Sequence, residues 1–156
     1  MLRVLRLGIT AGMLGALLIT AAASAAQPTV FTIDIVFDDP GTPANEASET
    51  FHSDGSIICA SGPAITDQDS FRFAGGGRQG KGNGTFHLEK TLICGNGTLR
   101  IAVDAASTMT GTVGGWTILS GTGAYTSVRG SGQIVGIGDP GGGIDLQDHY
   151  TGRLTD

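Results

Sequence analysis

After its first 26 residues the sequence lacks a convincing helical pattern. Glycine is frequent, with 27 of 156 residues in the whole chain, and apolar residues recur at every second position rather than every third or fourth. Residues 29–37, TVFTIDIVF, illustrate this period, because they place Phe31, Ile33, Ile35 and Phe37 on one face. The missing helical period argues against helical bundles and α/β folds and predicts an all-β domain.

The sequence also lacks an internal repeat, a separate linker and a low-complexity tail, so we expect residues 27–156 to form one domain. Strand-like runs lie at 29–37, 50–52, 56–60, 70–74, 85–94, 98–105, 112–120, 131–137 and 143–154. Gly-rich turns separate them, and the GNG motif at 95–97 predicts a hairpin. This pattern predicts a closed or nearly closed antiparallel barrel of about eight strands, because closure removes exposed sheet edges.

Residues 1–26 show the pattern of a secretory signal peptide. Arg3 and Arg6 form a positive start, an apolar stretch follows, and AAASAA offers a cleavage site after Ala25 or Ala26. The apolar run is too short and too rich in glycine for a comfortable membrane span, so we expect no span in the mature chain. The pattern predicts an exported protein, either secreted or periplasmic.

Basic residues are scarce after the signal peptide. Arg3 and Arg6 account for two of the nine basic residues, so the mature chain keeps seven against all 14 acidic residues, a net charge of −7. An acidic exported chain argues against nucleic acid and anionic membrane surfaces as partners.

Only two cysteines are present, Cys59 and Cys94, and an even count in an exported protein predicts one disulfide. No partner ligands stand at metal spacing around them, so we expect neither a metal site nor a cofactor. The GGGRQGKG stretch at 75–82 nearly matches a phosphate-binding loop, but it lacks the final Ser or Thr and precedes a strand instead of a helix.

Motifs of nucleophilic hydrolysis are absent as well, and the strongest chemical signal is a pair of charged residues at apolar positions. Lys90 shares a strand face with Phe86, Leu88 and Leu92, and Asp148 shares one with Ile144, Leu146, Tyr150 and Leu154. A lone buried charge is costly, whereas a paired one is tolerated. We therefore expect Asp148 and Lys90 either to meet inside the barrel or to line its mouth, unless a bulge turns one of them outward.

The stretch GGWTILSGTGAYTSVRGSGQI at 114–134 resembles a signature of the allene oxide cyclase and dirigent β-barrel superfamily. It looks more like small secreted bacterial proteins with an allene-oxide-cyclase-like barrel, and the IICASGPA and KTLICGNGTLRI segments around Cys59 and Cys94 also resemble those proteins. The resemblance implies an eight-stranded barrel whose interior holds an apolar molecule. In cyclases and dirigent proteins that interior steers cyclisation or coupling of a reactive lipid or phenolic intermediate. The resemblance assigns no catalytic residue to a position in this chain.

Three functions are the alternatives. The first is a non-enzymatic barrel that binds an apolar small molecule. Its predicted cavity residues are Phe31, Ile33, Phe86, Leu88, Ile144 and Tyr150. The second is a cofactor-free cyclase or isomerase with Asp148 and Lys90 as its polar groups. The third is a purely structural envelope or interaction protein with a filled barrel. The oligomeric state stays open.

The GTGAYTSVRGSG stretch at 121–132 predicts a junction between two strands. We expect the ring of Tyr125 to cover the barrel end and Arg129 to bond carbonyls or a carboxylate at the rim. Contact of Tyr125 or Arg129 with a ligand is the alternative interpretation.

Overall fold

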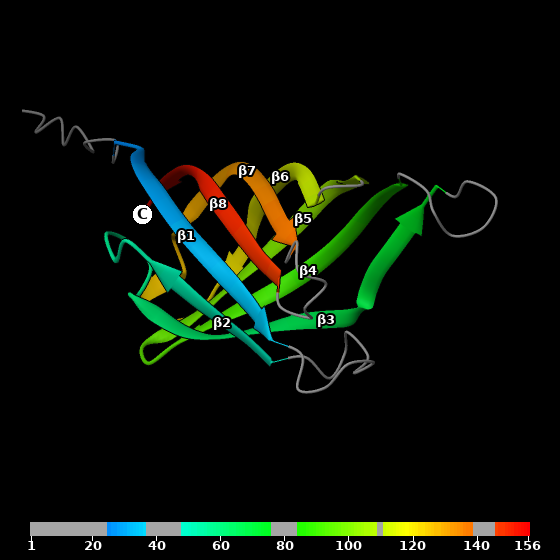
Figure 1. Cartoon of the computed structure of the whole chain (residues 1–156). Helices are drawn as coiled ribbons and strands as arrows, with labels where there is room; N and C mark the ends of the chain where they lie inside the picture. The colour runs from blue at the N-terminus through cyan, green and yellow to red at the C-terminus, as the bar shows by residue number, and fades with distance from the viewer. Residues whose placement is uncertain (1–24, 37–47, 76–83, 109–110, 139–145) are drawn as a thin grey trace, which may run out of the picture.

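The computed structural model describes residues 25–36, 48–75, 84–108, 111–138 and 146–156. Within these ranges the chain forms a closed antiparallel barrel in which each strand pairs with the next and β8 pairs with β1 (Figure 1). The strands are β1 (Gln27–Val36), β2 (Ser48–Ser53), β3 (Ser61–Ala74), β4 (Gly84–Cys94), β5 (Gly97–Thr108), β6 (Gly111–Gly121), β7 (Arg129–Gly138) and β8 (Leu146–Thr155). A short 3-10 helix, η1 (Gly123–Tyr125), lies between β6 and β7. The predicted eight-stranded barrel is confirmed.

The hairpin of β4 and β5 results from alternation of side chains along the two strands. Leu92 lies opposite Leu99, and Leu88 lies opposite Val103, so apolar side chains of both strands face the interior. Gly95 forms the connecting turn with the next residue, and the hairpin predicted from the GNG motif is therefore confirmed.

The third strand is longer than its sequence pattern indicates. Short runs are predicted at 56–60 and 70–74, whereas the structure has one strand over residues 61–74 and bends over residues 55–58. The register of β3 against β4 shifts between Asp67 and Arg72, and an Asp67 carboxylate oxygen accepts a hydrogen bond from the backbone of Asp69 at 3.1 Å. This polar stretch is therefore a bulge inside a strand rather than a loop between strands.

An aromatic cluster fills the middle of the barrel. The rings of Phe31 and Tyr150 stack with centroids 4.4 Å apart, and Trp116 meets Phe31 edge-on at 5.3 Å. The indole N–H of Trp116 donates to the carbonyl of Thr151 at 3.2 Å, so its polar atom is satisfied. A Cβ on Gly152 would lie 2.6 Å from the Trp116 ring, and this glycine therefore makes room for the indole. The packed centre divides the interior into two ends.

We call one of these the disulfide end; β2, β4, β6 and β8 end here. Its Cys59–Cys94 bridge is formed, with sulfur atoms 2.07 Å apart, as the cysteine count predicts. Tyr125 is 4% exposed, and Ile58 and Val128 are buried beside the same core. At the other end, which we call the cavity end, β1, β3, β5 and β7 terminate around a hollow in the interior.

The GTG motif explains how η1 closes the disulfide end. Gly123 has a φ of 58°, and a Cβ there would lie 2.1 Å from the carbonyl oxygen of Asn96. This close approach allows the backbone N–H of Ala124 to donate to Asn96 at 3.0 Å. Thr122 adds a backbone bond to Thr98 at 2.9 Å. The motif predicted as a strand junction therefore fastens η1 onto the turn between β4 and β5.

Candidate ligand cavity

A cavity of about 320 Å³ opens at the cavity end of the barrel. Its residues are Ile35, Phe71, Phe73, Phe86, Leu88, Lys90, Val103, Ser107, Thr112, Ile134, Asp148 and Tyr150. The walls are mainly aliphatic and aromatic, and the charged groups are Lys90 and Asp148. A mostly apolar hollow with a few convergent polar groups is the usual composition of a small-molecule site.

Strand alternation brings the polar groups inward. On β4, Phe86, Leu88 and Lys90 are successive members of one face and all line the cavity. On β8, Asp148 and Tyr150 do the same. The phases inferred from the sequence are thus the phases of the structure, and neither charged residue is turned outward by a bulge.

Lys90 is held by two side chains from neighbouring strands. Its ammonium nitrogen lies 2.7 Å from Glu49 Oε2 on β2 and donates to Thr66 Oγ1 on β3, also at 2.7 Å. The Thr66 hydroxyl donates in turn to Glu49 Oε1 at 2.6 Å. The side chains of Lys90 and Glu49 are only 4% and 7% exposed, so this is a buried ion pair with a hydroxyl bridging its ends.

The direct partner of Lys90 is therefore Glu49 and not Asp148. Of the two arrangements predicted for Lys90 and Asp148, the structure shows the one in which both line the cavity. Glu49 and Thr66 are the members of this cluster that were not predicted from the sequence. A signal for Glu49 was present, because it stands two residues before Phe51 and so shares its inward phase.

Asp148 has much weaker support than Glu49. The Tyr150 hydroxyl donates to Asp148 Oδ2 at 3.4 Å, a long bond, and Asp148 has no other hydrogen bond or ion pair with the described residues. Burial raises the pKa of the Asp148 carboxyl, and the charge of Glu49 acts in the same direction. The charge of Lys90 and the Tyr150 bond oppose this pKa shift without cancelling it.

Tyr150 joins the aromatic cluster to the cavity. Its side chain is fully buried, and burial together with the carboxylates of Asp148 and Glu49 raises the pKa of its hydroxyl well above the ordinary value. The phenol therefore stays protonated and acts as a hydrogen-bond donor at the cavity wall. Of the other residues predicted to line a cavity, Phe86 and Leu88 do so. Phe31 and Ile33 are packed below the cavity instead, and Ile144 lies outside the described residues.

Tyr125 and Arg129 lie at the opposite end of the barrel, and neither lines this cavity. Tyr125 is buried over the disulfide end, while exposed Arg129 donates to the carbonyls of Thr126 and Val128 at 3.1 and 2.7 Å. Both side chains thus have the structural place predicted for the junction, although the Arg129 contacts are local carbonyls only.

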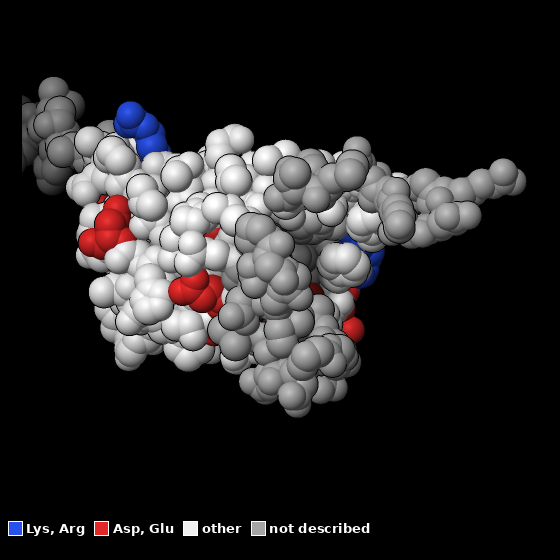
Figure 2. Space-filling view, in the orientation of Figure 1, with Lys and Arg blue, Asp and Glu red and all other residues white. Residues whose placement is uncertain are grey.

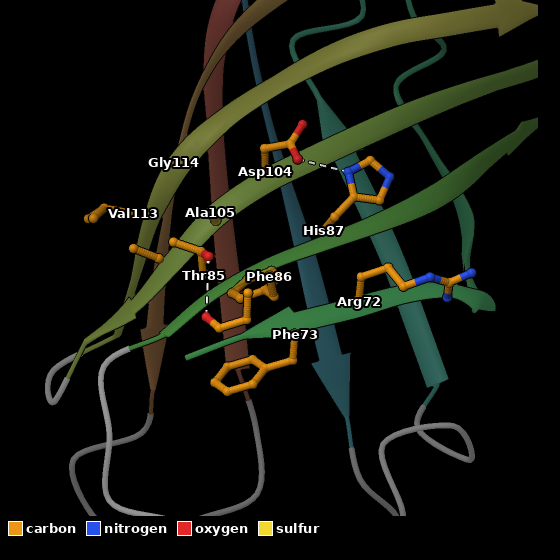
Figure 3. A pocket seen from close by; sticks show the side chains of 11 residues that line it. Arg72, Phe73, Thr85, Phe86, His87, Asp104, Ala105, Val113 and Gly114 are labelled. Atoms are coloured by element: carbon orange, nitrogen blue, oxygen red, sulfur yellow. Dashed lines mark hydrogen bonds and ion pairs between the residues drawn. The ribbon is translucent and has the colours of Figure 1, made fainter. Parts of the chain in front are cut away.

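A second hollow, of about 460 Å³, lies across β3 to β6 (Figure 3). It shares Phe73 and Phe86 with the first cavity, and its polar residues include His87 and Asp104, which meet at 2.8 Å across β4 and β5. The Asp104 side chain is 76% exposed and already paired, so water and His87 satisfy it. The larger hollow therefore offers a ligand less than the smaller one, where Asp148 is half-buried and has one long hydrogen bond.

Charged side chains are sparse on the described surface seen in Figure 2, where acidic groups are scattered over the visible face. Among the described residues, no three His, Cys, Asp or Glu side chains are placed to hold a metal ion. Within the same ranges, no helix is long and apolar enough to cross a membrane.

Comparison with protein-family models, curated proteins and solved structures finds no match to this chain. The resemblance to the allene oxide cyclase and dirigent superfamily therefore stays a prediction, and any function proposed for the chain rests on the chemistry of its cavity.

Proposed function

We propose that this is an exported, non-enzymatic protein that binds a small, mostly apolar molecule in the cavity of about 320 Å³. The observation that carries the proposal is an apolar hollow next to a packed barrel centre, with Asp148 and Tyr150 at its wall. A barrel with a purely structural role would have no reason to keep a carboxyl at this position, because burial without a strong partner costs stability.

Export rests on the sequence pattern of residues 1–26 and is supported by the disulfide, which suits an oxidising compartment. Intact-mass measurement of protein recovered from its source tests it. We expect a chain that begins after Ala25 or Ala26, and a full-length chain would contradict export with cleavage.

A cofactor-free cyclase or isomerase is the second candidate. Asp148 favours it, since a weakly solvated carboxyl in an apolar pocket can stabilise a developing positive charge. The rest of the polar cluster favours binding, because Lys90 is already bonded to Glu49 and Thr66. Incubation with a bound molecule, followed by mass spectrometry of the recovered ligand, separates the two functions, because only an enzyme would convert it.

A cavity-filling substitution tests ligand binding. Leu88→Trp places a large ring in the hollow, and we expect at least tenfold weaker binding of an apolar fluorescent probe. Ile65→Trp is the matched control, because Ile65 is 55% exposed on β3 and lines neither hollow. Near-ultraviolet circular dichroism confirms that each variant is folded. Equal probe binding by wild type and folded Leu88→Trp would overturn the proposed site, and Val103→Phe provides a second filling variant.

A further inference from the structure

We propose that the cavity selects apolar amines, with the single ammonium group of the ligand paired to Asp148. This ligand class rests on the proposed binding function. It depends on how the charges inside the barrel are compensated.

Three ionisable side chains lie at or beside the cavity: Lys90 and Asp148 line it, and Glu49 bonds Lys90. Lys90 and Glu49 neutralise one another at 2.7 Å, and both are nearly fully buried. Asp148 is left with the 3.4 Å bond from Tyr150, which supplies no positive charge. The described part of the interior therefore holds one carboxylate more than it holds cations.

This surplus negative charge determines the expected order of ligand affinities. An ammonium group near Asp148 would remove the surplus charge, and in a poorly solvated site such a pair is stronger than in water. A hydroxyl group could bond Asp148 but would leave its charge uncompensated. A carboxylate would add a third negative group beside Glu49 and Asp148, facing one Lys90 that already bonds two oxygens.

The cavity walls indicate the chemistry of the rest of the ligand. Phe71 and Phe86 stack with centroids 6.4 Å apart, and both line the cavity with Leu88. Aromatic rings accept an apolar body and also attract a nearby cation through their faces. Because the described part of the interior has one uncompensated carboxylate, the expected ligand carries one ammonium group rather than several.

The pH dependence has a definite sign. The groups that act on Asp148 are Lys90 on β4, Glu49 on β2, and His149 and Tyr150 on its own strand. Its neighbours across the sheet, Ile33 on β1 and Gly136 on β7, are uncharged. Protonation removes the charge of the carboxyl, so amine affinity falls as the pH drops through the Asp148 pKa. A bound ammonium group in turn lowers that pKa.

Calorimetric titration of the disulfide-bonded protein with phenylbutylamine, phenylbutanol and phenylbutyrate tests the proposal, because these probes share one apolar body. We expect the amine to bind at least tenfold more tightly than the alcohol, and the carboxylate to bind most weakly. Asp148→Asn, which keeps the shape of the side chain, should bring the amine to within about twofold of the alcohol. Asp104→Asn, in the second hollow, should leave the preference unchanged.

The outcomes separate the two proposals. Equal or tighter binding of the alcohol, an amine preference that survives Asp148→Asn, or its loss in Asp104→Asn would overturn amine selection while leaving a binding protein. No binding of any of the three probes would overturn the proposed function itself. If Asp148→Asn is unfolded, the pH titration of the wild type decides, because only the amine affinity should fall on acidification.

Discussion

The two ends of this barrel are closed by different means. At the disulfide end, a covalent bridge, the 3-10 helix and the buried ring of Tyr125 cover the core. At the cavity end, the interior contains a buried ion pair and a cavity of about 320 Å³. The difference indicates that the two ends have different roles. The disulfide end stabilises the fold, whereas the cavity end contains groups that lower stability and that can serve binding.

Truncating the ring at the disulfide end should have the largest effect. We expect Tyr125→Ala to lower the free energy of unfolding by about 3–5 kcal/mol, because it leaves a void under η1. Chemical denaturation measures this change. Arg129→Ala is the control and should cost less than about 1 kcal/mol, since its side chain is exposed. Equal effects of the two substitutions would mean that the ring does not close this end.

Breaking the ion pair of Lys90 and Glu49 tests how the cavity end contributes to the free energy of unfolding. Lys90→Met leaves the Glu49 carboxylate buried without a cation, and we expect a loss of about 3–4 kcal/mol. The double variant Lys90→Met with Glu49→Gln should recover most of it, because no buried charge then remains in the pair. Urea denaturation of both variants measures the difference. A double variant as unstable as the single one would show that the cost comes from packing and not from charge.

Removing the disulfide should have a somewhat smaller effect. Replacing Cys59 and Cys94 by Ser opens a loop of 35 residues, and we expect about 2–4 kcal/mol less stability in denaturant unfolding. Probe binding at the cavity should persist in the folded variant, because the bridge lies at the other end. A loss of binding without unfolding would show that the two ends are coupled.

The smallest change in the free energy of unfolding is expected from substitution of Asp148, and this change should stabilise the protein. Its carboxyl pKa is raised in the folded protein above the ordinary value, so protonation favours folding. The stabilising effect of the proton is present at low pH and is lost as the pH rises through the raised pKa. We expect Asp148→Asn to be more stable than the wild type at neutral pH, by less than about 1 kcal/mol, and to lose this advantage in acid. Thermal unfolding across this pH range measures it, and lower stability at neutral pH would contradict the burial argument.

Much of the barrel could be predicted because alternation is a local signal. The inward phases of Phe86, Leu88 and Lys90 on one strand, and of Asp148 and Tyr150 on another, result from residue spacing alone. The long β3 could not be found in this way, since the bulge after Asp67 interrupts the period and its polar residues imitate a loop.

The partner of Lys90 was harder to predict for a different reason. Pairing inside a barrel depends on strand order and stagger, which bring β2, β3 and β4 together around one ammonium group. The alternation of side chains along each strand predicts that Lys90 and Glu49 both face inward, but it does not predict that they contact each other. The same limit applies to Asp148, whose lack of a strong partner is visible only in three dimensions.

Methyl-group NMR of the disulfide-bonded protein during titration with phenylbutylamine distinguishes the two ends in one experiment. We expect the Leu88, Val103 and Ile134 signals, from the cavity wall, to shift, and the Ile58 and Val128 signals, from the disulfide end, to stay in place. Shifts confined to the disulfide end, or to Val113 in the second hollow, would contradict a ligand site at the cavity end.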